Sequence, residues 1–172
     1  MSDIFLEQIV KQQKSVKQIV RNCLIILVGL IIACALLPFS LFRPNYGPFV
    51  FLVFAGVLYY TWYIVSGLNL EFEYIFTNGD LDIDKISNKR KRKRMTSIRI
   101  SKISLFSEFD AAKFDKKAFD VVYEAAQSVQ SEQNYMIQYA NREGKKCVLI
   151  FTPNEKLVEA IRKYYRPGVR AL

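Results

Sequence analysis

Six consecutive basic residues, Lys89, Arg90, Lys91, Arg92, Lys93 and Arg94, are the strongest chemical signal in this sequence. Residues 71–172 hold 20 Lys plus Arg against 14 Asp plus Glu, so this segment is neutral once the six are removed. Such a run attracts phosphate or carboxylate groups. Three interpretations stay open: contact with anionic lipid headgroups, a solvated block that only sets membrane topology, and binding to nucleic acid or an acidic protein. No aromatic residue is interleaved, which disfavours stacking on nucleic-acid bases and leaves lipid contact as the preferred hypothesis.

The remaining residue types argue against catalysis. The chain has no His, which removes Ser-His-Asp, Cys-His and HExxH sites. Asp80, Asp82 and Asp84 alternate as on one solvent-facing strand face, whereas a calcium loop needs converging oxygens. The three cysteines form no CxxC pair. We therefore predict a non-enzymatic protein with no catalytic residue, no metal site and no cofactor.

Two long apolar stretches lie before the basic run. Asn22 to Phe42 is uncharged over 21 residues and Pro44 to Leu70 over 27, with Arg43 alone between them. About 20 apolar residues cross a bilayer as a helix. The sequence predicts a transmembrane hairpin over residues 22–70, with spans of about 22–42 and 46–68. Buried helices of a soluble bundle are the alternative.

The flanks of these stretches predict their orientation. Basic residues precede the first span at Lys11, Lys14, Lys17 and Arg21, and the run at 89–94 follows the second, so both termini are expected to be cytoplasmic in a multi-pass plasma-membrane protein. Trp62 and Tyr63 are expected at the headgroup level. Gly29 and Ala33 form a small-xxx-small pattern that favours close helix packing, either within the hairpin or between protomers.

The N-terminal segment, residues 1–21, is predicted to be an amphipathic helix at the membrane surface. Its apolar stripe holds Phe5, Ile9, Val16 and Val20, and its basic residues fall largely on another stripe. Two alternatives are a helix that packs on the soluble domain and a simple extension of the first span.

Residues 71–172 show strand patterns and are predicted to form one cytoplasmic domain. Alternating residues on either side of Asn78-Gly79 predict a hairpin. Further strands are expected at 96–101, 119–126, 134–140 and 145–151, with a short helical or loop segment over 110–118. The capping box Thr152-Pro153-Asn154-Glu155 begins a helix over 154–165. The predicted fold class is an α+β membrane protein: a two-helix transmembrane hairpin, then an antiparallel meander or barrel of at least six strands capped by a C-terminal helix.

The order of elements from Glu71 to Ile103, with an aromatic strand, an Asn-Gly turn, a basic loop and an Ile-x-Ile strand, resembles the start of bacterial PH-like domains. The whole chain resembles small uncharacterised Gram-positive membrane proteins in which such a domain follows two membrane helices. The resemblance implies a binding module and brings no catalytic residues. In lipid-binding PH domains the basic pocket typically lies around the first hairpin loop, whereas here the basic cluster is in the next loop.

Together these patterns predict a membrane-anchored adaptor. Its PH-like domain is expected to dock on anionic inner-leaflet lipid through residues 89–94 and to present another surface to a protein partner. The alternative is a structural subunit of a larger membrane complex or homo-oligomer, assembled through the transmembrane helices and Gly29.

Overall fold

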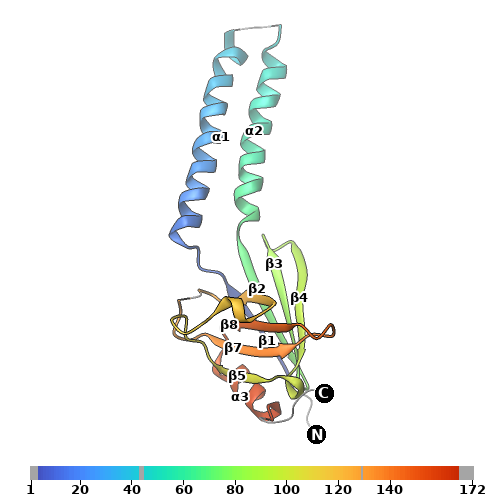
Figure 1. The fold of residues 1–172 in the computed structure, drawn as a ribbon. Coiled ribbons are helices and arrows are strands. Elements are labelled where there is room, and N and C mark those ends of the chain that lie inside the picture. The colour runs from blue at the N-terminus through green and yellow to red at the C-terminus, as the bar shows by residue number, and fades with distance from the viewer. Residues whose placement is uncertain (1–3, 43–44, 129, 167–172) are drawn as a thin grey trace. The chain divides into compact units, whose positions relative to one another are not determined.

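The computed structural model describes residues 4–42, 45–128 and 130–166, and it divides into two units. Residues 14–69 form one unit, in which helices α1 (Val16–Phe42) and α2 (Gly47–Gly67) run side by side (Figure 1). The residues before Lys14 and after Asn69 form the other unit, a domain of two sheets and a helix. The two long helices are therefore an insertion into the chain of this domain.

Both helices are long and apolar enough to cross a bilayer. At 1.5 Å per residue, the 27 residues of α1 extend about 40 Å and the 21 residues of α2 about 31 Å. They approach closely at Gly29, where a Cβ atom would lie 2.8 Å from Cγ2 of Thr61. Gly29 therefore packs α1 against α2 of the same hairpin, the first of its two expected roles.

The expected helix over residues 1–21 is wrong for its first half. Residues Phe5–Lys11 form strand β1, which pairs antiparallel with β2 (Leu70–Thr77) over seven residue pairs. Leu6, Gln8 and Val10 alternate toward the interior, and a continuous ladder with β2 outweighs the weak helical stripe. The second half extends the first span, because residues 16–21 are the first turns of α1.

Sheet A has the order β1-β2-β3-β4, with β3 at Asp80–Ser87 and β4 at Lys91–Arg99. Its inner face carries the large core residues, among them Phe72, Tyr74, Phe76, Leu81, Ile83 and Ile98, all at most 3% exposed. The predicted Asn78-Gly79 turn is confirmed, with φ of 49° and 95°. Because β1 is the first strand of the sheet, this turn joins the second strand, β2, to the third, β3.

Sheet B differs from the expected antiparallel meander. Its order is β5-β7-β8-β6, and β6 pairs parallel with β8, so the chain crosses the sheet between β6 and β7. The expected hairpin of β7 and β8 is confirmed, whereas the short edge strand β5 was not predicted. The elements are η1 (Ile100–Lys102), β5 (Leu105–Glu108), η2 (Lys116–Ala118), β6 (Val121–Ala125), β7 (Tyr135–Ala140) and β8 (Lys146–Phe151).

Helix α3 (Glu155–Tyr164) closes the core, as predicted, but the expected capping box does not form, because the Thr152 hydroxyl accepts a hydrogen bond from the Gln127 N–H and donates to Asn134 instead. Asn154 caps the helix, because its side-chain oxygen accepts a hydrogen bond from the Leu157 backbone N–H at 2.9 Å. Leu157 and Ile161 are buried in the core that sheets A and B share. Tyr164 covers the β2–β3 turn so closely that a Cβ on Gly79 would lie 2.7 Å from its ring.

Candidate functional site

The basic run is not one loop. Asn88, Lys89 and Arg90 form a turn, and residues 91–94 are the first four of β4. The Arg90 N–H donates to the Ser87 carbonyl at 3.1 Å, and Asn88 and Lys89 have φ of 50° and 54°. Asn tolerates this left-handed region, but a lysine there carries a conformational cost. The strand pairing, which local sequence does not encode, converts most of the expected loop into sheet.

A β-bulge determines how the four cations of β4, residues 91–94, divide between the two faces of sheet A. Ile83 pairs with Thr96 but Asp84 pairs with Arg94, so Met95 is an extra residue on β4. Regular alternation from the buried Thr96 would turn Arg94 and Arg92 inward. The extra residue reverses this, so both arginines share the outer face with the carboxylates of β2 and β3.

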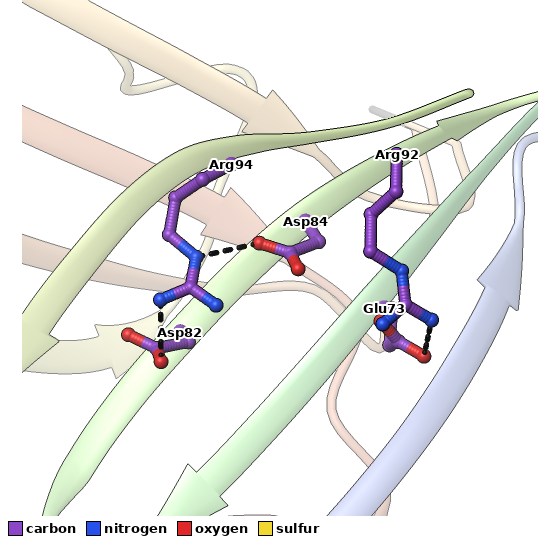
Figure 2. A network of polar contacts seen from close by, with 5 residues as sticks. All are labelled: Glu73, Asp82, Asp84, Arg92 and Arg94. Carbon is purple, nitrogen blue, oxygen red and sulfur yellow. Dashed lines mark hydrogen bonds and ion pairs between the residues drawn. The ribbon is translucent and has the colours of Figure 1, made fainter.

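Arg92 is held by a buried carboxylate. Its Nη2 lies 2.7 Å from Oε1 of Glu73, whose side chain is only 2% exposed (Figure 2). Burial raises the pKa of Glu73 above its ordinary value; Arg92 opposes this rise, and the neighbouring Glu7 and Asp84 carboxylates add to it. Arg92 is therefore the counter-ion of a carboxylate that has little contact with water.

Arg94 is held by two carboxylates. Its Nε donates to Asp84 and its Nη1 donates to Asp82, each at 2.7 Å (Figure 2). At the other end of β4, Arg99 pairs with Asp80 at 2.9 Å. The three alternating aspartates share one face as predicted, but Asp84 is only 4% exposed instead of solvated. This face is a ladder of ion pairs.

The unpaired cations lie elsewhere on the same hairpin. Among the described residues, no ion pair involves the five members of a group that we call the cationic tip: Lys85, Lys89, Arg90, Lys91 and Lys93. Lys85 and Lys93 are direct partners across the strands, on the face opposite the ion-pair ladder. Compared with the six residues expected from the sequence, the cationic tip excludes Arg92 and Arg94, which are held in ion pairs, and includes Lys85. With the turn at residues 88–90, counting back along β3 places Lys85 opposite Lys93, so the sequence held a signal for this residue.

The cationic tip lies at the end of sheet A where the chain leaves for the helices. In the strand register, Lys11 at the end of β1 lies opposite Glu71 on β2, and Leu70 at the start of β2 lies opposite Ser87, beside the turn. The Gln12 N–H donates to the Leu70 carbonyl at 3.0 Å, which holds the outgoing and returning chain together. Figure 1 shows this end of the β3–β4 hairpin extending past the strands of sheet B.

The predicted interfacial residues fall on α1, α2 and β1 and on the link between β1 and α1. Lys17 and Arg21 are exposed on the first turns of α1, and Trp62 and Tyr63 are exposed near the end of α2. The ring centroid of Tyr59 lies 5.9 Å from that of Trp62 and 6.5 Å from that of Tyr63. Lys11 is instead on β1, and Lys14 is in the link before α1. Ala33 is buried at 2% exposure in the helix pair.

Comparison with known families covers nearly the whole chain. The family model described as Bacterial PH-like domain (DUF6106) matches residues 2–171. The chain belongs to this family. No curated protein and no solved structure matches it.

Within this PH-like domain the long helices occupy the connection between the first and second strands. The matched region includes β1 and both helices, so the family pattern contains the insertion. The expectation that a PH-like domain simply follows the membrane helices is therefore corrected. The basic turn joins the third and fourth strands.

Proposed function

We propose that this protein is a two-pass plasma-membrane adaptor whose PH-like domain docks on anionic lipid headgroups through the cationic tip. The domain acts by binding and not by catalysis, and its remaining surface receives a protein partner. The observation that carries the proposal is the separation of the basic cluster into paired arginines and unpaired cations, with the unpaired ones gathered at the tethered end of the sheet.

The pairing of β1 with β2 supports two passes. β1 precedes both helices and β2 follows them, yet they form one ladder of seven residue pairs. Both flanks of the helical hairpin must then be on the same side of a membrane, so the helices cross together. The basic residues on these flanks favour the cytoplasmic side. Protease treatment of sealed right-side-out vesicles should leave N- and C-terminal tags intact; cleavage of either tag would contradict this orientation.

The short links to the helices support contact between the tip and the bilayer. Two residues separate Gln13 from α1, and two separate α2 from Leu70. At about 3.5 Å per residue, each link extends at most about 10 Å. The tethered end of sheet A is therefore confined near the membrane surface. A basic residue near anionic lipid contributes about 1 kcal/mol, so five contribute about 5 kcal/mol at low ionic strength. This energy orients a domain that is already anchored.

The experiment compares hydrogen exchange of the β3–β4 hairpin in nanodiscs of neutral phosphatidylcholine and of phosphatidylcholine with phosphatidylglycerol. Anionic lipid should slow exchange at the turn in the wild-type protein. Slowing should be lost in a variant with four tip changes: Lys89→Gln, Arg90→Gln, Lys91→Gln and Lys93→Gln.

A matched control removes four exposed charges elsewhere: Lys113→Gln, Lys117→Gln, Lys156→Gln and Lys163→Gln. This control should respond to anionic lipid as the wild type does. Equal exchange at the turn in the two lipids would contradict the proposal.

A further inference from the structure

A polar cavity lies in the domain away from the cationic tip. It has a volume of about 670 Å³ and lies between β4, η1 and the turn that joins β7 to β8. Sites for small molecules commonly measure about 300–1,000 Å³. Its β4 wall ends at Arg99, which pairs with Asp80 at the opposite end of sheet A from the basic turn. The cavity is therefore distinct from the proposed lipid contact.

A hydrogen bond between the two sheets forms a fixed part of this cavity. The hydroxyl oxygens of Thr96 on β4 and Tyr139 on β7 lie 2.6 Å apart, and both residues are buried. Burial raises the pKa of Tyr139, so its hydroxyl keeps its proton at neutral pH. The bond joins β4 to β7 and holds the walls of the cavity in place.

The charges in the cavity are unevenly matched. Its two carboxylates are occupied, since Asp80 pairs with Arg99 at 2.9 Å and Glu143 pairs with Lys145 at 2.7 Å. Its two other cations, Lys102 and Arg142, take part in no ion pair among the described residues.

These two cations come from different elements with defined geometry. Lys102 ends the short helix η1. Arg142 is on the β7–β8 turn, where the Asn141 side-chain oxygen accepts hydrogen bonds from the Glu143 and Lys145 backbone N–H groups, each at 2.9 Å. The lining therefore contains two cations without an ion-pair partner among the described residues, on two different elements, together with Ser97 and Tyr123, which carry hydroxyl groups.

We propose that this cavity binds a phosphate monoester of a small hydroxylated molecule, with Lys102 and Arg142 contacting the phosphate. A phosphate monoester carries close to two negative charges at neutral pH and three strong acceptor oxygens, which match two cations. The hydroxyl groups of the lining can donate to the phosphate or to the hydroxyls of the ligand. The phosphate can come from a soluble metabolite or from a lipid headgroup.

Calorimetric titration of the full chain in neutral phosphatidylcholine nanodiscs tests the soluble source, with glycerol 3-phosphate, glucose 6-phosphate and inorganic phosphate as probes. At least one probe should bind saturably. Lys102→Gln and Arg142→Gln should each weaken its binding about tenfold, whereas Lys117→Gln, an exposed cation outside the cavity, should leave it unchanged.

A second arm tests the lipid source. Nanodiscs that contain phosphatidylinositol 4-phosphate replace the soluble probes, and hydrogen exchange is followed at Thr96 to Arg99 and at the β7–β8 turn. Slower exchange that requires Lys102 and Arg142 would assign the phosphate to a headgroup. The proposal is overturned if neither source binds, or if binding is unchanged in both cavity variants and is lost only in the fourfold tip variant; that variant leaves the cavity intact, so the two proposals fail separately.

Discussion

Arg94→Gln and Lys93→Gln should separate folding from membrane contact at two adjacent positions. Arg94 donates to the carboxylates of Asp84 and Asp82, each at 2.7 Å, and Asp84 is nearly buried. A charge-assisted hydrogen bond contributes about 1.5–3 kcal/mol, and because the Arg94 side chain is 52% exposed we reduce the sum of two such bonds to about 2 kcal/mol. Lys93 makes no ion pair with any other residue that the structure describes, so its replacement should change stability by less than about 0.5 kcal/mol.

Hydrogen exchange of the β8 amides measures this difference, since these residues form the centre of sheet B and exchange through opening of the domain. In neutral nanodiscs, a loss of 2 kcal/mol corresponds to about 30-fold faster exchange for Arg94→Gln. Lys93→Gln should exchange as the wild type does. In anionic nanodiscs, the turn should lose part of its lipid-dependent protection in Lys93→Gln and keep all of it in Arg94→Gln. Wild-type exchange of β8 in Arg94→Gln, or equal acceleration in both variants, would refute the assignment of Arg94 to the fold.

Three further predictions follow from single residues. Lys89→Gly should stabilise the domain by up to about 1 kcal/mol, because glycine adopts the left-handed conformation without cost, and should weaken protection of the turn by anionic lipid; urea unfolding and lipid-dependent exchange measure the two effects. Burial raises the pKa of Glu73, so the contribution of this group to stability should fall as pH rises above about 4.5, and Glu73→Gln should remove that part of the pH dependence in urea titrations from pH 4 to 7; an unchanged pH dependence would contradict the assignment. Gly29→Ala should destabilise the helical hairpin by about 1–3 kcal/mol through a clash with Thr61, whereas Gly56→Ala, with open space around its Cβ, should cost less; thermal melting of the helical circular dichroism signal compares them.

Local patterns were enough to predict the elements whose partners are adjacent in sequence. The spans, the Asn78-Gly79 hairpin, the β7–β8 hairpin and α3 all have their signals within about 20 residues. β1 could not be predicted in this way, because its partner β2 begins 59 residues after Lys11. A short segment with both helical and alternating features is decided by whichever partner the fold supplies.

The site was predicted in position but not in chemistry. The sequence located the basic run, yet the roles of its members depend on one extra residue, Met95, which moves Arg92 and Arg94 to the face that carries Glu73 and Asp84. A bulge of this kind depends on the whole ladder and leaves no signal in the run itself. Lys85 was missed for a different reason: residues 89–94 were expected to be one loop, whereas with the turn at residues 88–90 a regular pairing places Lys85 opposite Lys93.

Chemical labelling of lysine amines tests the central claim most directly. The tip contains four lysines, Lys85, Lys89, Lys91 and Lys93, and other exposed lysines such as Lys117, Lys156 and Lys163 serve as internal references in the same sample. Mass spectrometry should find the four tip lysines several-fold less reactive in anionic than in neutral nanodiscs, with the difference lost at 1 M salt, where the Debye length falls to about 3 Å. Equal reactivity of the tip lysines in both lipids, or equal protection of the reference lysines, would contradict docking of the domain through the cationic tip.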